Sequence, residues 1–458
     1  MDAVFFPLAY LALALAFFTT SRRWRDGINP LSVILALGFV RFGIPGLLQL
    51  LGADPDVNLF RTMRLDDTDW LLGHALALLG FLGVAIGWQL PCKSLGSALR
   101  WIGRRANVRL TRGVRYAALA GMVVGFIALM AFVASNASLG DVIRTGDFRR
   151  TEIQVGTGIF FWLSLLLIAS SVVLAAHLMA TDRAWWVSLL PVCVATVLFW
   201  TLGGRVRAIT PFATGVLLLW YRKNRPGLSV KTGALLVIGL LPAVLLAGQL
   251  YRGGLGVEGI TQAFSIDGVL GYIQSAIWVD WGQLYVLAGA TAIGPAILDG
   301  GTFLKTLLWP LSESILPVHG RSAGVFLAEH FVGFVGGKSW AFHSGLIGDA
   351  YLNFGLAGVF ITTIIFGVLV KRLYIGWKEG WIHAPVYLLS LLYGTRIFFE
   401  SIEKFTEAWI VVAMTVVVIR AGQLTFRPAL GARTVGRPVT SRSPLAPQFP
   451  AAGPVDAG

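Results

Sequence analysis

Two arginines, Arg205 and Arg207, stand in the sequence Gly-Gly-Arg-Val-Arg between two apolar stretches. Glycine lets another group approach the backbone closely, and a guanidinium group can bind phosphate through two parallel hydrogen bonds. The pair therefore indicates recognition of a diphosphate in a tight turn at a membrane surface. The alternative interpretation is an interfacial arginine pair whose side chains extend to lipid headgroups.

His343 and Asp349 are the best candidates for acid–base chemistry. His343 opens an apolar stretch, and histidine is the side chain whose ordinary pKa lies near neutrality, so it is the favoured general base. Asp349 follows near the same end of the expected helix and could act as the base or orient it. The alternatives are an ordinary interfacial histidine and a polar contact between helices.

Arg41 lies about midway along an apolar stretch, in Val-Arg-Phe-Gly-Ile-Pro. An unpaired charge is costly inside a membrane, so such an arginine is a functional candidate by default. It could face a water-filled cleft. The alternative is a buried structural pair, with an acidic residue or with carbonyl groups left free next to Pro45.

Arg396, Glu400, Glu403 and Glu407 are spaced so that they can share one face of a helix. This spacing favours a solvated face that carries an ion pair between Arg396 and Glu400. A pair of carboxylates for glycoside hydrolysis is the weaker alternative.

The chain lacks the motifs of nucleotide-driven and metal-dependent enzymes. It has no Walker-type glycine-rich loop, no dinucleotide fingerprint and no His-Glu-x-x-His. His319, His330 and His343 are too widely spaced for a typical metal site, and Cys92 and Cys193 form no ligand cluster. We therefore expect no metal and no cofactor.

The elements that must position these residues are membrane helices. Of the 458 residues, 56% are hydrophobic and only 13% are charged, and the mean hydropathy is +0.74. This is more apolar surface than a soluble core could bury, so the sequence predicts an all-α, polytopic integral membrane protein of about 11 spans. The expected spans are residues 3–20, 30–51, 70–90, 114–134, 158–178, 184–201, 208–220, 232–250, 344–370, 381–399 and 408–419.

Lysine and arginine alternate between the loops that join these spans. Cytoplasmic loops collect basic residues, and here every second loop is basic, as is the C-terminal tail. The pattern places the N-terminus outside and the C-terminus in the cytoplasm. It also attributes the net charge of +14 to membrane orientation and contact with anionic lipids, not to a nucleic-acid partner.

The expected organisation has four parts. Residues 1–250 form an N-terminal bundle of about 8 spans, and residues 344–423 form about 3 further spans. Between them, residues 251–343 form a large outer loop, rich in aromatic residues, in which we expect helices lying at the membrane interface. Residues 424–458 are rich in Pro, Ala, Gly, Arg and Ser, and predict a disordered cytoplasmic tail.

The stretch from His343 to Gly358, His-Ser-Gly-Leu-Ile-Gly-Asp-Ala-Tyr-Leu-Asn-Phe-Gly-Leu-Ala-Gly, resembles the motif of bacterial O-antigen polymerases and related oligosaccharide repeat-unit polymerases. Asp349, Tyr351 and Asn353 are its most telling polar residues, with Asp349 standing where glutamate is frequent. Gly203-Gly204-Arg205 resembles the arginine-bearing outer turn of that family. Trp309-Pro310 and Arg321, with the spacing from Arg321 to Gly337, resemble its outer loop.

The resemblance implies a membrane-embedded, GT-C-like, inverting and metal-independent glycosyltransferase in the inner membrane of the cell. Its substrate would be a polyprenyl-diphosphate-linked oligosaccharide, and a chain-length regulator protein would be a partner. His343, Asp349 and Arg321 would be catalytic. The residues Arg205, Arg207, Arg41, Tyr351 and Asn353 would bind the substrate. An O-antigen ligase is the nearest alternative function, and a non-enzymatic flippase of lipid-linked saccharides is the third.

Overall fold

The computed structural model describes residues 29–50, 65–92, 112–136, 158–181, 184–201, 205–223, 283–308, 323–332, 342–402 and 404–425, together with residues 9 and 12. Regular secondary structure within these ranges is entirely helical. The elements are α2 (Pro30–Gly38), η1 (Phe39–Gly43), α3 (Ile44–Leu50), α5 (Asp67–Gln89), α6 (Arg112–Asn136), α8 (Gly158–Ser164), α9 (Leu166–Ala180), α10 (Trp185–Thr201), α11 (Arg205–Lys223), α15 (Gln283–Ile293), α16 (Gly301–Leu308), α17 (Ala323–Phe331), α18 (Gly345–Lys378), α19 (Ala384–Phe399) and α20 (Lys404–Thr425).

Among the residues that the structure describes, six helical segments are long and apolar enough to cross a membrane, which supports the expected membrane class. They are Pro30–Leu47, Asp67–Gln89, Arg112–Ser135, Gly158–Ala180, Gly345–Lys378 and Lys404–Leu424. The number is smaller than the about 11 expected. Helices α10, α11 and α19 are apolar over shorter lengths. The expected spans at residues 3–20 and 232–250, like the expected tail, lie wholly or mostly outside the described residues.

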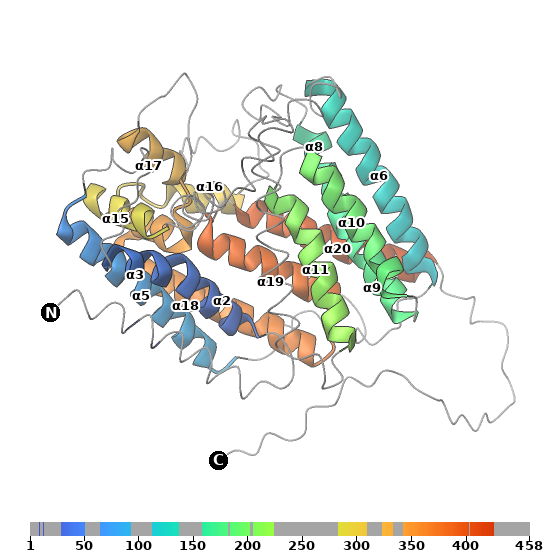
Figure 1. Cartoon of the computed structure of the whole chain (residues 1–458), viewed down its shortest axis with the longest axis horizontal. Coiled ribbons are helices and arrows are strands. Elements are labelled where there is room, and N and C mark those ends of the chain that lie inside the picture. The colour runs from blue at the N-terminus through green and yellow to red at the C-terminus, as the bar shows by residue number, and fades with distance from the viewer. Residues whose placement is uncertain are drawn as a thin grey trace, which may run out of the picture.

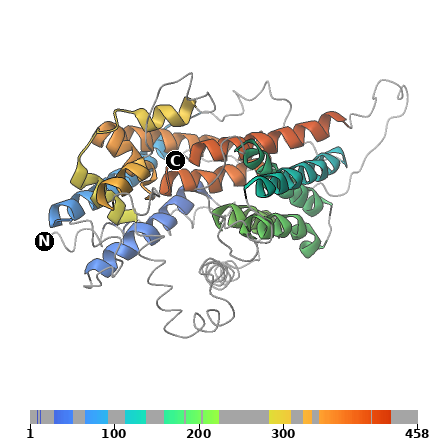
Figure 2. The ribbon, with the colours of Figure 1, turned by 90° about the horizontal axis from the view of Figure 1, so that it is seen from above.

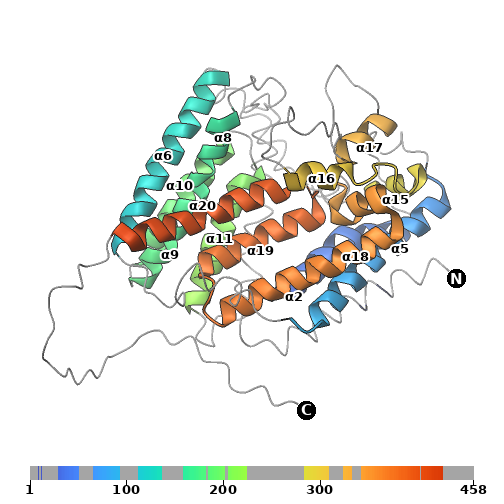
Figure 3. The ribbon, with the colours of Figure 1, turned by 180° about the vertical axis from the view of Figure 1, so that it is seen from behind.

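The helices pack in two groups that meet at α19 (Figure 1). One group holds α2, α3, α5, α15 and α18, and the other holds α6, α8, α9, α10 and α11. Seen from behind, α18, α19 and α20 lie side by side (Figure 3). Seen from above, α20 reaches from the first group across to α6 (Figure 2). The two groups are thus joined by the last two helices of the chain.

Helices α5 and α18 run in the same direction and pack closely through glycines. A Cβ atom at Gly80 would lie 2.4 Å from Ile347, and one at Gly87 would lie 2.1 Å from the carbonyl oxygen of Ile364. Further along, Lys371 Nζ donates to the carbonyl oxygen of Leu90 at 2.8 Å. Small residues at membrane helix interfaces allow such close approach of the two backbones.

Other contacts fix the relative directions of the remaining helices. The start of α11 meets the start of α20 through Arg207 and Glu407, while the end of α20 meets the start of α6, where Gly422 lies against Val114. In these pairings α11 and α20 run in the same direction, and α6 runs opposite to α20, as the alternation of basic loops requires. The starts of α11, α18 and α20 and the end of α19 therefore lie at one end of the bundle.

Helix α15 lies inside the bundle. Its residues from Gln283 to Thr291 are all buried, mainly against α5 and α18. A Cβ atom at Gly73 would lie 3.0 Å from the main-chain nitrogen of Ala288, so the two backbones touch. Its small residues thus let protein enclose this segment, and the expectation of helices lying at the membrane interface stays a prediction.

Candidate active site

The start of α18 and the turn that joins α19 to α20 are tied together by hydrogen bonds. The main-chain N–H of Gly345 donates to the carbonyl oxygen of Glu400 at 2.9 Å. In the opposite direction, Ser401 Oγ and the N–H of Ile402 donate to Asp349 Oδ2 at 3.0 and 2.7 Å. Ser344 Oγ donates to the other oxygen, Oδ1. Asp349 therefore fastens two distant parts of the chain.

Gly345 is required by this close contact. Its φ is +64°, in the left-handed region, and a Cβ atom there would lie 2.9 Å from the carbonyl oxygen of Phe398. A residue with a side chain would be strained in this conformation and would also push α19 away.

His343 and Glu400 both lie at this junction, but their side chains differ in solvent exposure. His343 is exposed, whereas the side chain of Glu400 is only 8% exposed. Burial by itself raises the pKa of Glu400, but the charge and hydrogen bonds of Arg396, together with two other positive groups, bring the net pKa below the ordinary value. His343 and Lys404 act in the same direction. The junction thus presents an imidazole to the outside with an ionised carboxylate behind it.

Arg396 binds two buried carboxylates. Its Nε lies 3.2 Å from Glu400 Oε1, and its Nη1 lies 2.9 Å from Glu407 Oε1. Tyr393 donates its hydroxyl proton to Glu407 at 3.3 Å. The predicted pair of Arg396 and Glu400 is confirmed, but the predicted solvated face is wrong. The face is turned inward because α11 and α20 both pack on α19.

Arg207 completes this group of buried charges from α11. Its Nε and Nη2 donate to the two oxygens of Glu407 at 3.2 and 2.9 Å, and its guanidinium lies 4.5 Å from the ring centroid of Phe161. We expected Arg205 and Arg207 in a turn between helices, but α11 begins at Arg205, so both stand in its first turn. A helix N-terminus disfavours cations, and the carboxylate of Glu407 offsets this cost for Arg207.

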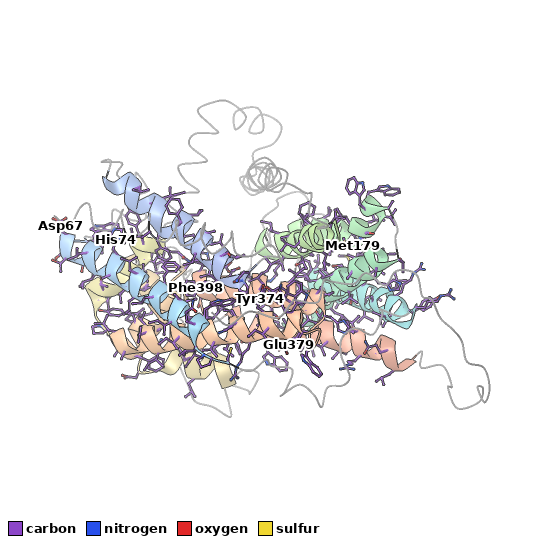
Figure 4. All side chains as sticks on the ribbon, turned by 90° about the horizontal axis from the view of Figure 1, so that it is seen from below. Asp67, His74, Met179, Tyr374, Glu379 and Phe398 are labelled. Carbon is purple, nitrogen blue, oxygen red and sulfur yellow. The ribbon has the colours of Figure 1, made fainter. Side chains whose placement is uncertain are left out.

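Five phenylalanines, from η1, α5, α18 and the end of α19, pack against one another, and the last of them directly precedes Glu400 in the sequence. Phe398 lies near the middle of the bundle (Figure 4). Its ring centroid is 5.6 Å from that of Phe81 and 5.3 Å from that of Phe366. The ring centroid of Phe42 lies 5.7 Å from that of Phe81 and 6.3 Å from that of Phe399. This apolar cluster lowers the local polarity around Glu400 and strengthens its electrostatic interactions.

Arg41 lies against one ring of this cluster. It stands in the π-helical turn η1, where the N–H of Ile44 bonds to the carbonyl of Phe39. Pro45 follows and supplies no N–H, which explains why the helix widens here. The Arg41 guanidinium carbon lies 5.3 Å from the ring centroid of Phe399, the residue before Glu400.

Tyr351 and Asn353 serve a second junction, one to two turns further along α18. The carbonyl oxygens of Tyr351 and Leu352 accept hydrogen bonds from the N–H groups of Ala296 and Leu298. Asn353 accepts one from the N–H of Thr302 at 3.3 Å, at the start of α16. Helix α18 is broken just afterwards at Gly355, whose φ is +68°. Both side chains are buried, and their predicted role in binding substrate stays a prediction.

The predicted site residues are thus brought together in part. His343 and Asp349 share the junction, Arg41 lies against Phe399, and Arg207 ends the chain of charges that begins at Glu400. Asn353 Nδ2 donates to the carbonyl oxygen of Asp349 at 2.7 Å, one helical turn away, and Tyr351 stands between these two residues in the sequence. The side chains of Arg205, Arg321 and Glu403 lie outside the described residues.

Sequence reasoning missed the buried state of Arg396, Glu400 and Glu407. A signal was present, because α19 is apolar on nearly all its faces, with Tyr393, Ile397 and Phe398 around its single arginine. A helix of that kind is enclosed, so its charges must be paired with others in the protein.

The described residues contain no group of three or more His, Cys, Asp or Glu side chains that could hold a metal ion. What the described groups can do is acid–base chemistry, with an exposed imidazole as the proton acceptor and a buried carboxylate to stabilise its charged form. No protein-family model, no curated protein and no solved structure matches the chain.

Proposed function

We propose that this protein is a membrane glycosyltransferase that joins lipid-linked oligosaccharide repeat units into a polymer. The observation that carries the proposal is the junction of His343 and Glu400, where an exposed imidazole and a buried carboxylate meet at an end of a bundle of membrane helices. The motif from His343 to Gly358, which resembles that of repeat-unit polymerases, places the same histidine at the same junction.

The reaction needs few protein groups. His343 accepts the proton of an acceptor hydroxyl while its oxygen attacks the anomeric carbon of the donor sugar. The bond from that carbon to the diphosphate oxygen breaks, the configuration inverts, and the polyprenyl diphosphate leaves with the electron pair. Asp349, which is fully buried and bound by Ser344, Ser401 and Ile402, holds the junction and is not the base.

Cations must stabilise the departing diphosphate. We assign this role to Arg205 and Arg321, as the resemblance implies. Arg207 is given another role, because both oxygens of Glu407 already accept from its guanidinium. It anchors α11 to α20 at the end of the bundle where His343 lies.

The proposed setting is the outer face of the inner membrane, in biosynthesis of O-antigen, capsule or exopolysaccharide. The alternation of basic loops puts the junction of His343 and Glu400 on the outer side, with the C-terminus in the cytoplasm. No nucleotide sugar is available there, so a lipid-linked saccharide serves as both donor and acceptor. A chain-length regulator would act as a partner in the same membrane.

A deletion strain tests this function against the ligase alternative. Loss of a polymerase leaves single repeat units attached to the final acceptor, whereas loss of a ligase leaves none attached. We expect single units, and restoration of long chains by the wild-type gene. Attachment of no units would instead assign the chain as a ligase.

Reconstitution tests it against the flippase alternative. Purified protein in liposomes is mixed with polyprenyl-diphosphate-linked repeat units, and products are separated by size and identified by mass spectrometry. We expect new glycosidic bonds and one free polyprenyl diphosphate for each bond. Movement of the lipid between leaflets without bond formation would contradict an enzymatic role.

A further inference from the structure

The Glu400 carboxylate occupies the position between an exposed base and a buried arginine. Its main-chain carbonyl accepts from Gly345, two residues after His343, which brings the two segments together, and the positive charge of His343 acts on the carboxylate. On its inner side, Arg396 Nε and Nη2 lie 3.2 to 3.3 Å from its oxygens. Arg396 thereby fixes the carboxylate on this inner side.

We infer that Glu400 is a positioning residue for His343, and that Arg396 holds its carboxylate in place and ties it through Glu407 to Arg207 on α11. The carboxylate orients the imidazole and stabilises its protonated form after proton transfer. The effect on catalysis rests on the proposed function, whereas the placement of Glu400 near His343 rests on the hydrogen bond of Gly345 to Glu400 and on the electrostatic interaction of the two side chains.

Arg396 suits this role because of the shape of its side chain. Its planar fork reaches Glu400 with Nε and Nη2 while Nη1 reaches Glu407 at 2.9 Å. A lysine has one nitrogen and cannot hold two carboxylates in this geometry. The four groups Arg207, Arg396, Glu400 and Glu407 carry two positive and two negative charges, so the charges of these four side chains balance.

The other titratable groups around Glu400 do not replace it. Lys404 at the start of α20 adds a positive charge, and Tyr393 donates to Glu407 rather than to Glu400. Asp349 lies on the α18 side but is fully buried and accepts from Ser344 and Ser401. Arg41 contacts the face of Phe399. Among the described residues, Glu400 is the carboxylate that interacts electrostatically with His343 and whose main-chain carbonyl is also hydrogen-bonded to Gly345, in the same segment as His343.

The reactivity of His343 tests the inference without reference to activity. Diethyl pyrocarbonate modifies neutral imidazole, so the extent of modification against pH, measured by peptide mass spectrometry on the full-length protein, reports when His343 loses its proton. We expect Glu400→Gln to move the midpoint of this profile to lower pH by about one unit or more, because an opposite charge nearby favours the protonated form. His330, exposed on α17, is the internal reference, and its midpoint should not move.

Two further variants keep the test decisive if Glu400→Gln folds poorly. Arg396→Gln combined with Glu400→Gln removes equal and opposite charges, so no uncompensated charge stays buried, and it should lower the His343 midpoint as well. Glu379→Gln removes an exposed carboxylate at the other end of α18 and should leave the profile unchanged. A His343 midpoint that is the same in the wild type and in the double variant would overturn the inference.

Activity separates this inference from the proposed function. In the reconstituted assay, Glu400→Gln should lower kcat about tenfold or more with little change in KM, and Glu400→Asp should recover part of the loss, since neither residue touches the substrate. Polymerisation by Glu400→Gln with the wild-type kcat and pH profile would refute the positioning role while the function stands. Absence of polymer from the wild type would refute the function, and the His343 modification profile would still decide the positioning role.

Discussion

The main-chain N–H of Gly345 donates to the carbonyl oxygen of Glu400 at 2.9 Å, so the first residue of α18 is fixed to the residue that directly follows α19. These residues are 55 positions apart in the sequence. The contact sets the exposed His343 in front of the buried charges and joins the two helix groups at the same point. Stability and function should therefore respond together when this junction is altered.

Gly345→Ala should destabilise the protein. The positive φ of +64° costs a non-glycine residue about 1–3 kcal/mol, and the new methyl group would meet the carbonyl oxygen of Phe398. Thermal unfolding in detergent measures the effect. Gly301→Ala is the matched control, because a Cβ atom there meets nothing within 4 Å. Equal melting temperatures for the two variants would show that the close contact is absent.

Arg396→Leu should be more damaging, by about 3–5 kcal/mol, because it leaves two buried carboxylates without their shared partner. Arg396→Leu combined with Glu400→Gln and Glu407→Gln should destabilise the protein much less, since no unpaired carboxylate then stays buried. Arg115→Leu, at an exposed position of α6, is the control. Equal stability of Arg115→Leu and Arg396→Leu would argue that the charges are solvated after all.

Much of the helical framework could be predicted from the sequence, because apolar stretches near the length of a membrane report helices directly. The expected spans at residues 70–90 and 114–134 coincide with α5 and α6 to within a few residues. The position of Arg207 could not be predicted. Its partner Glu407 lies 200 residues away, and no local pattern reports a contact of that range.

The candidate site was predictable in its residue types but not in their roles. His343 and Asp349 were both candidates for the base, and only burial distinguishes the exposed histidine from the enclosed aspartate. The i, i+4 spacing of Arg396 and Glu400 predicted their pair correctly. Spacing along one helix carries no information about which neighbours cover it, so the solvated face was predicted wrongly.

Gly87→Val should disrupt the packing of α5 on α18. The added atoms would lie on the carbonyl oxygen of Ile364, at 2.1 Å for Cβ, and overpacking of this kind costs about 1–3 kcal/mol or more. Gly158→Val adds the same side chain where nothing lies within 4 Å. Unfolding in detergent should separate the two variants clearly. A Gly87→Val protein as stable as Gly158→Val would contradict the direct contact of these helices.

Stability should fall as the pH drops from about 6.5 toward 4. Burial and then the positive charge of Arg420 lower the pKa of His383, which precedes α19, from 6.5 to about 4. The unfolded chain therefore takes up this proton first, and protonation favours unfolding below pH 6.5, with no effect above it. The slope of melting temperature against pH in this window should be smaller for His383→Gln. An unchanged slope would assign the effect to other groups.

The rate of repeat-unit joining by His343→Gln tests the central claim most directly. Reconstituted protein is given polyprenyl-diphosphate-linked repeat units, and the length of the products is followed by mass spectrometry, with His330→Gln as the control at another exposed histidine. We predict a ladder of products from the wild type and from His330→Gln, and a rate lower by at least about 100-fold for His343→Gln, the loss typical for a general base. A ladder formed by His343→Gln at the wild-type rate would contradict the account.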